Sequence, residues 1–110
     1  MIRRDVIRLW PALFLLLVAG TSAAADKGQW MSYTCTDGQT LQASYPDRDT
    51  AVIRLKGKTH RLHSVESGSG ARYIGDGWQW WTKGMHQGQL APLSARETLA
   101  SAPALTCRAP

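Results

Sequence analysis

The sequence predicts an all-β fold, a small single-domain antiparallel β-barrel of about eight strands closed by one disulfide. Three observations favour this fold. Apolar and polar residues alternate with a period of two, turn residues interrupt the pattern at short intervals, and two cysteines lie near the ends of the strand-rich region. Short strands joined by short turns pair in antiparallel fashion, and closure into a barrel removes exposed sheet edges.

The first 25 residues are expected to lie outside this domain. Three arginines precede an apolar stretch at 9–19, and three alanines end at Ala25, which is the pattern of a signal peptide. We therefore expect a signal peptide at 1–25, cleavage near Ala25 and one domain at 26–110. No cysteine lies near this junction, so we expect a periplasmic or secreted product that is not a lipoprotein and keeps no stable membrane anchor. The alternative is an uncleaved membrane anchor.

The remaining 85 residues suffice for one small domain. They contain ten basic and seven acidic residues, a net charge of +3. Five of the basic residues cluster in the middle of the chain, at Arg48, Arg54, Lys56, Lys58 and Arg61, interrupted by apolar positions at strand spacing. We interpret this cluster as a solvated sheet face and expect no nucleic-acid partner.

The strands are expected in the following order. Strand-like runs cover 30–36, 39–45, 50–56 and 59–65, separated by turns at 37–38, 46–49 and 57–58. A flexible loop at 67–70 leads into a hairpin at 69–84 with its turn at 75–77. Residues 89–91 and 104–107 are the last expected strands, and 93–99 is a possible short helix or crossover.

Cys35 and Cys107 are expected to form a disulfide, because an exported domain meets an oxidising compartment. The bond would tie the first strand to the last and would stabilise the domain by about 4 kcal/mol through loop-closure entropy. Free thiols or metal ligands are the alternative, but no CxxC spacing accompanies either cysteine. His60 and His63 fall on opposite faces of a strand, so no metal site is expected.

The hairpin at 69–84 brings chemically useful groups together. Its far ends, Ser69 and Lys83, should lie side by side, either as a nucleophile pair or as an insert for an acidic cleft. Trp78 and Trp80 share one strand face and Trp81 takes the other, so at least one of these faces should pack in the core. A contact between Trp81 and a partner is left open.

Two motifs in this hairpin identify a resemblance. Residues 69–73 match an S-G-x-x-Y pattern and residues 80–84 read W-W-T-K-G. The chain resembles the periplasmic and membrane-bound branch of the bacterial inhibitors of C-type lysozyme across the predicted domain. The resemblance implies an eight-stranded barrel closed by the Cys35–Cys107 disulfide, with Ser69 and Lys83 inserted into the lysozyme cleft against its catalytic carboxylates. Loop and scaffold support would come from Gly70, Tyr73, Trp80, Trp81, Thr82 and Gly84.

The resemblance further implies a C-type lysozyme as the protein partner, protection of the cell wall of a Gram-negative bacterium, no cofactor and no enzymatic activity. It does not address the oligomeric state. The chain departs from the family pattern at Trp78, where a tyrosine is common, and after Gly84, where Met85 to Gly88 lack the acidic residue often found there. This absence puts the bracing of the lysine loop in doubt.

Two other functions remain open. The first is a peptidoglycan- or carbohydrate-binding module that uses exposed tryptophans. The second is a hydrolase with Ser69 as nucleophile and Lys83 as base. An 85-residue barrel with both groups at loop tips offers little substrate cleft or oxyanion hole, so we expect no enzyme.

Overall fold

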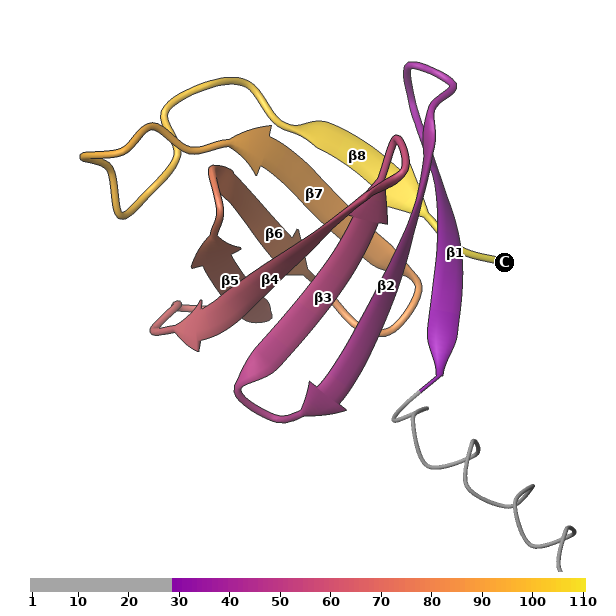
Figure 1. Ribbon diagram of the computed structural model, residues 1–110, viewed down its shortest axis with the longest axis horizontal. Coiled ribbons are helices and arrows are strands. Elements are labelled where there is room, and N and C mark those ends of the chain that lie inside the picture. The colour runs from indigo at the N-terminus through magenta and orange to yellow at the C-terminus, as the bar shows by residue number, and fades with distance from the viewer. Residues whose placement is uncertain (1–28) are drawn as a thin grey trace, which may run out of the picture.

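The computed structural model describes residues 29–110, which form a closed barrel of eight antiparallel strands (Figure 1). The expected all-β barrel is confirmed. The strands are β1 (Trp30–Cys35), β2 (Thr40–Asp47), β3 (Thr50–Leu55), β4 (Lys58–Val65), β5 (Ala71–Gly75), β6 (Trp78–Thr82), β7 (Gln87–Pro92) and β8 (Leu105–Arg108). The signal peptide expected at 1–25 lies outside the described residues. Within the described residues, no helix is long and apolar enough to cross a membrane.

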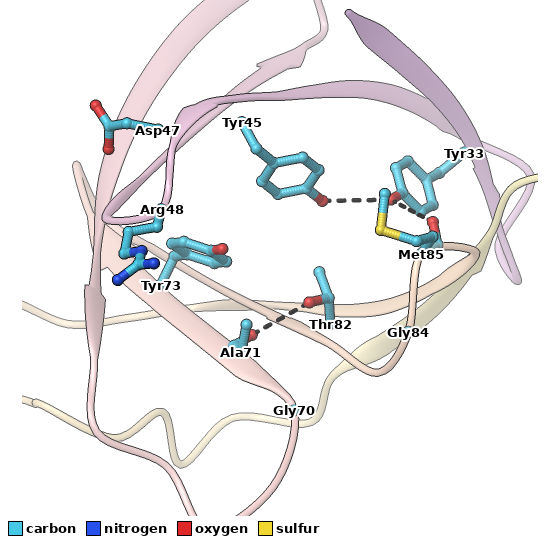
Figure 2. A pocket seen from close by; sticks show the side chains of 10 residues that line it. All are labelled: Tyr33, Tyr45, Asp47, Arg48, Gly70, Ala71, Tyr73, Thr82, Gly84 and Met85. Atoms are coloured by element: carbon cyan, nitrogen blue, oxygen red, sulfur yellow. Dashed lines mark hydrogen bonds between the residues drawn. The ribbon is translucent and has the colours of Figure 1, made fainter. Parts of the chain in front are cut away.

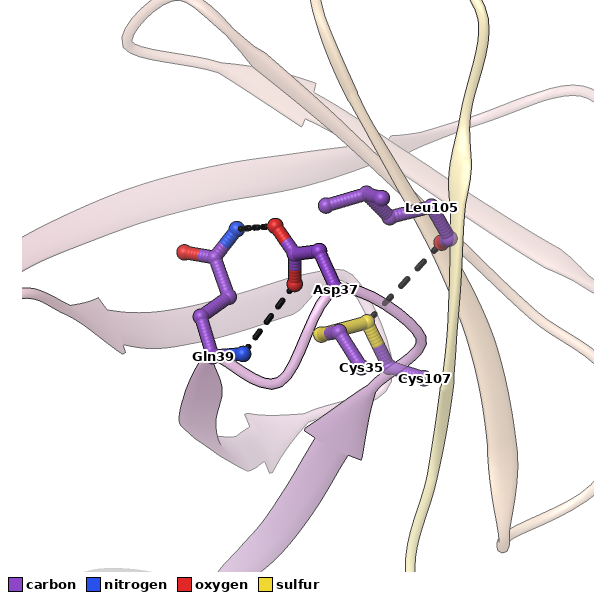
Figure 3. Close-up of a disulfide and its surroundings, with 5 residues drawn as sticks. All are labelled: Cys35, Asp37, Gln39, Leu105 and Cys107. Carbon is purple, nitrogen blue, oxygen red and sulfur yellow. Dashed lines mark hydrogen bonds between the residues drawn. A yellow bond between two sulfur atoms is a disulfide. The ribbon is translucent and has the colours of Figure 1, made fainter.

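Each strand pairs with the next along the chain, and β8 returns to pair with β1. The disulfide lies at this closure, because Cys35 and Cys107 are directly opposite each other in the β1–β8 register. Figure 3 shows the bond beside the β1–β2 turn. The predicted pairing and its role in tying the first strand to the last are thus confirmed. The disulfide constrains the barrel at its shortest strand, β8.

The core follows from the alternation of side chains along the strands. Its central residue is Trp80, which is 0% exposed and meets the Tyr33 ring edge-on at a centroid distance of 5.0 Å. Gly88 on β7, which pairs with Thr82, lies against this indole, and any Cβ there would overlap the ring. Trp78 packs partly buried against the same core, so the expectation that one tryptophan face is internal is confirmed. The large Trp80 side chain thus fills the interior of the barrel next to Gly88, which has no side chain.

Two of the expected turns differ from the structure. The β3–β4 turn is at Lys56 and Gly57, one residue earlier than predicted, because these two residues have the positive φ angles that a tight two-residue hairpin needs. The β2–β3 turn is shorter than predicted, since Pro46 and Asp47 extend β2 past an irregularity that begins at Ser44. Proline is tolerated where the ladder is interrupted.

The segment at 93–99 forms no helix and instead belongs to a long connection between β7 and β8. The sequence left a short helix or a crossover open, and tertiary hydrogen bonds hold this segment as an irregular connection. The Gln79 side chain accepts a bond from the Ala100 amide at 3.0 Å, and Arg72 donates to the Thr98 carbonyl at 2.7 Å. β5 and β6 therefore determine the path of this connection.

Antiparallel pairing divides the connections between the two ends of the barrel. One end holds the β2–β3 turn and the connections at 66–70 and 83–86. The opposite end holds the β1–β2, β3–β4 and β5–β6 turns and the long β7–β8 connection. The Ser69 and Lys83 loops therefore share one end of the barrel, which we call the tip end.

Candidate functional site

The β5–β6 hairpin places Ser69 and Lys83 as the sequence predicted. Ala71 lies opposite Thr82 in the register, so the residues just outside this pair emerge together at the tip end. The turn at the far side uses Asp76 and Gly77 with φ angles of 51° and 84°, as a tight hairpin turn requires. Ser69 and Lys83 are both exposed. The hairpin therefore places both residues at the same end of the barrel, with their side chains exposed to solvent.

The Ser69 loop is held from inside by hydrogen bonds to its backbone. Trp81 donates its indole N–H to the Ser69 carbonyl oxygen at 2.8 Å. The Ser67 hydroxyl donates to the carbonyl oxygens of Ser69 and Gly70, each at 3.1 Å. Gly70 has a φ of 67°, and a Cβ there would overlap the Thr82 carbonyl oxygen. Gly70 thus permits a close approach between the two motifs, as expected of a supporting residue.

Arg72 is a second brace that the sequence reasoning did not single out. Its guanidinium donates to the Glu66 carbonyl oxygen at 3.1 Å, to the Thr98 carbonyl oxygen at 2.7 Å and to the Gln79 side chain at 3.2 Å. The same group lies 5.5 Å from the centroid of the Trp81 ring. It occupies one of the two variable positions of the S-G-x-x-Y pattern, so the motif alone gave no signal for it. Arg72 fixes the start of the Ser69 loop to the β7–β8 connection.

The Lys83 loop is braced without the acidic residue that the sequence lacks. The Lys83 amide donates to the Gln87 carbonyl oxygen at 3.0 Å, and the Tyr33 hydroxyl donates to the Met85 carbonyl oxygen at 3.1 Å. The Ala109 amide donates to the His86 carbonyl oxygen at 2.8 Å. Two backbone amides and one tyrosine hydroxyl therefore do the bracing, which a sequence pattern of side-chain charges cannot reveal.

Trp81 lies between the two tips and supports both of them. Its ring is half-buried, with the Lys83 ammonium 5.9 Å from its centroid. The indole N–H is already used by Ser69. The Thr82 hydroxyl, next to it, donates to the Ala71 carbonyl oxygen at 3.4 Å across the hairpin. Trp81 is therefore placed as a support for the tips, and contact with a partner stays untested.

A hollow of about 620 Å³ opens at the tip end between these loops, and Figure 2 shows the residues that line it. It is lined by Tyr33, Tyr45, Asp47, Arg48, Gly70, Ala71, Tyr73, Thr82, Gly84 and Met85. Gly70, Tyr73, Thr82 and Gly84 were expected as supporting residues of the hairpin. Tyr33, Tyr45 and Asp47 were not expected here, because they come from β1 and β2, which are distant from the hairpin in the sequence. Tyr73 was expected as a packing residue, and it is buried at the wall of this hollow.

Tyrosine hydroxyls form a chain along one wall of the hollow. Trp80 donates its indole N–H to the Tyr45 hydroxyl at 2.9 Å, and the Tyr45 and Tyr33 hydroxyls are 3.2 Å apart. Burial raises the pKa of Tyr45 far above its ordinary value. The pKa of Tyr73 is also raised, first by burial and then by the nearby Tyr45, Asp47 and Asp49. The hydroxyls of Tyr45 and Tyr73 therefore remain neutral donors and acceptors at physiological pH.

The rim of the hollow carries an ionised carboxylate at Asp47. The Asp49 amide donates to its side chain at 2.9 Å and holds the pKa of Asp47 below its usual range. Arg48 lies beside it on the exposed turn (Figure 2). The tip end is therefore electrostatically mixed, with Lys83 and Arg48 as cations and Asp47 as an anion.

Other groups considered in the sequence lie away from this site. His60 contacts Asp76 through a ring nitrogen at 2.6 Å, near the opposite end of the barrel, whereas His63 is exposed. Among residues 29–110, no group of three or more His, Cys, Asp or Glu side chains could hold a metal ion. The five clustered basic residues are all exposed, as a solvated face requires. None of the hairpin tryptophans is exposed as a sugar platform.

Three comparisons relate this chain to known proteins. The model of a family described as membrane-bound lysozyme inhibitor of C-type lysozyme matches residues 33–95. A membrane-bound lysozyme inhibitor of C-type lysozyme from Cupriavidus necator is 36% identical over 126 aligned positions, which cover 99% of this chain and 98% of the relative. The crystal structure of Pseudomonas aeruginosa MliC in complex with hen egg white lysozyme has the same fold, with a TM-score of 0.53 at 22% identity, over 76% of this chain and 83% of that one.

These findings correct one expectation. The predicted periplasmic or secreted product that is not a lipoprotein is contradicted, because the family and the relative are both described as membrane-bound. The prediction rested on the absence of a cysteine near Ala25, and an apolar segment followed by small residues is compatible with membrane attachment as well as with cleavage.

The family is one of inhibitors, so the hydrolase alternative for Ser69 and Lys83 is set aside. The family model and the relative carry the same description, and both matches cover the strands that carry the two motifs. The chain belongs to the family of membrane-bound lysozyme inhibitors of C-type lysozyme.

Proposed function

We propose that this chain inhibits a C-type lysozyme by inserting the Ser69 and Lys83 loops into the active-site cleft, where they engage the catalytic carboxylates. The observation that carries the proposal is the paired presentation of an exposed hydroxyl and an exposed ammonium on loops already braced by Trp81. Family membership supports the inhibitory activity. The motif positions support the choice of these two residues.

The chemistry of the two groups suits a cleft that contains two carboxyl groups. The Lys83 ammonium offers three donors and a compensating charge, and the Ser69 hydroxyl can both donate and accept. Lysozyme keeps one carboxylic acid protonated and one carboxylate ionised, so a hydroxyl can serve both. Coulomb attraction at about 4 Å is roughly 4 kcal/mol at an effective dielectric of 20, and desolvation of the ammonium offsets part of it.

Rigidity of the tips is the second contribution. An exposed lysine on a mobile loop would lose conformational entropy on binding, which costs about 0.5–1.5 kcal/mol for each immobilised side chain. Here the indole N–H of Trp81, the Ser67 hydroxyl and the Tyr33 hydroxyl fix the loop backbones in the free protein. Binding then has to order only the ends of the Ser69 and Lys83 side chains.

We further propose that residues 1–25 direct export and that the barrel, as the domain at 26–110, acts in membrane-attached form on the periplasmic side of a Gram-negative envelope. The Cys35–Cys107 disulfide supports this placement, because such bonds form and persist in oxidising compartments. In that position the inhibitor would meet lysozyme before the enzyme cleaves the cell wall.

The test is a cell-wall lysis assay with a C-type lysozyme and the full chain in a non-ionic detergent. We expect stoichiometric inhibition. Lys83→Ala should weaken binding by about 2–5 kcal/mol, and Ser69→Ala by about 1–3 kcal/mol. Lys58→Ala is the matched control, because Lys58 is an exposed lysine at the opposite end of the barrel. Unchanged lysis at molar excess of the inhibitor would reject inhibition, and parental inhibition by both tip variants would reject the insertion of these loops.

A further inference from the structure

Three polar side chains form a row across the outer face of β1, β2 and β3. Ser32 lies opposite Gln42, and Gln42 lies opposite Arg54 in the strand register. The Gln42 amide nitrogen donates to the Ser32 hydroxyl at 3.4 Å, and its oxygen accepts from the Arg54 guanidinium at 3.2 Å. The Arg54 guanidinium carbon also lies 4.1 Å from the centroid of the Trp30 ring, which is 38% exposed. This arginine is therefore held in place before any ligand arrives.

The row borders a hollow of about 530 Å³, the polar hollow, which is distinct from the one at the tip end. Its lining consists of Ser32, Gln39, Thr40, Leu41, Gln42, Arg54, Lys56 and Gly57. Two of these side chains are cations and none is a carboxylate. One carboxylate, that of Asp37, lies next to the lining, where both nitrogens of Gln39 donate to it. The two cations, Arg54 and Lys56, outnumber this anion, so the polar hollow suits an anionic group.

Gln39 places a second requirement on a ligand of the polar hollow. Its backbone and side-chain nitrogens both donate to the Asp37 carboxylate, the latter at 2.8 Å, so its side-chain oxygen must point away from Asp37 (Figure 3). That oxygen is buried and has no hydrogen-bond partner. The Gln39 side chain as a whole is half-buried and lines the hollow. A ligand that satisfies the side-chain oxygen must supply a donor, such as a hydroxyl.

We propose that the polar hollow binds an acidic saccharide, with a carboxylate on Arg54 and Lys56 and ring hydroxyls on the amide and hydroxyl groups around them. Arginine is suited to bidentate carboxylate binding, and Gln42 engages only one of its terminal nitrogens. The hollow lies on the side of the barrel toward the β1–β2 and β3–β4 turns, away from Ser69 and Lys83. The protein can therefore hold an acidic glycan and a lysozyme at the same time.

The test is an NMR titration of the full chain in polyoxyethylene detergent micelles with a galacturonic acid tetramer. We expect saturable shifts of the Trp30 indole N–H, the Arg54 side-chain N–H and the Gln39 amide. A neutral maltotetraose should bind at least about tenfold more weakly, because it lacks the carboxylate. Arg54→Gln should lower the affinity for the acidic tetramer by about tenfold or more and leave lysozyme inhibition unchanged.

Two controls keep the outcome specific. Arg61→Gln removes an exposed cation of the same face outside the hollow and should not change binding of the tetramer. Vesicles of anionic phosphatidylglycerol in place of the sugar test a lipid surface as the occupant. The proposal is overturned if the tetramer produces no saturable shifts, if Arg54→Gln and Arg61→Gln bind it equally, or if only the vesicles bind. If the parent protein did not inhibit lysozyme, the proposed function would be rejected. The titration would still test the binding of the tetramer, because the two assays measure separate events.

Discussion

Replacement of Gly70 by alanine tests whether the close approach of the two motifs determines the geometry of the tips. Gly70 has a φ of 67°, and an added Cβ would overlap the Thr82 carbonyl oxygen on the neighbouring strand. The same Cβ would lie 3.3 Å from the Trp81 indole nitrogen, which donates to the Ser69 carbonyl oxygen. The overlap is with backbone, so β5 and β6 would have to separate where Ser69 and Lys83 emerge.

The expected cost has two parts. The left-handed backbone conformation costs an L-residue about 1–2 kcal/mol. Relief of the overlap by a backbone shift adds about 1–3 kcal/mol, as for other overpacked sites. The sum, about 2–5 kcal/mol, should lower the melting temperature of a barrel of this size by about 10 °C or more. Inhibition should also weaken, because the hydrogen bond between Trp81 and Ser69 is disturbed.

Gly77→Ala is the matched control for Gly70→Ala. Gly77 has a φ of 84°, but a Cβ there would meet nothing within 4 Å, and its turn lies at the end opposite the tips. This variant should lose only about 1–2 kcal/mol and keep full inhibition. Thermal unfolding followed by near-ultraviolet circular dichroism, together with the lysis assay, measures both effects. Equal stability losses and equal inhibition in the two variants would refute the reasoning.

Three further predictions follow from the braces and the core. Arg72→Met should lower stability by about 1–3 kcal/mol and speed hydrogen exchange at 66–70, because three hydrogen bonds are lost; unchanged exchange and inhibition would show that Arg72 braces nothing. Because burial raises the folded-state pKa of Tyr45 above its unfolded value of 10.0, stability is full below about pH 10 and should fall by up to about 1.4 kcal/mol per pH unit above it. Denaturant unfolding from pH 8 to 11 measures this slope, which should be shallower in Tyr45→Phe, and an equal slope would contradict the assignment. Replacement of both Cys35 and Cys107 by serine should cost about 4 kcal/mol in denaturant unfolding, and a loss below about 1 kcal/mol would show that barrel closure does not depend on the bond.

The tip end shows how a small barrel presents two charged or polar groups without a large supporting loop. Ser69 and Lys83 lie just beyond a paired hairpin, and the indole of Trp81 lies between them. Arg72 extends this support to the β7–β8 connection, which otherwise has no regular structure. Precise placement of the tips thus depends on residues from several strands. Only some of these residues belong to the two motifs.

The sequence was sufficient for features that depend on local periodicity and turn chemistry. Alternation along the strands, the Asp76-Gly77 turn and the cysteine positions predicted an antiparallel barrel with a disulfide at its closure. These features can be predicted from the sequence because a strand has a side-chain period of two and a tight turn requires positive φ angles. The same locality placed Ser69 and Lys83 at neighbouring ends of one hairpin.

Only the tertiary structure decided which residues brace the tips and which line the two hollows. Tyr33 reaches the Met85 carbonyl oxygen across 52 positions, and Arg72 reaches the Thr98 carbonyl oxygen across 26. The same long-range bonds replaced the helix that local sequence allowed at 93–99. Hydrogen bonds between distant segments depend on how the closed sheet brings its strands together. A sequence pattern does not give the distances in space between those segments.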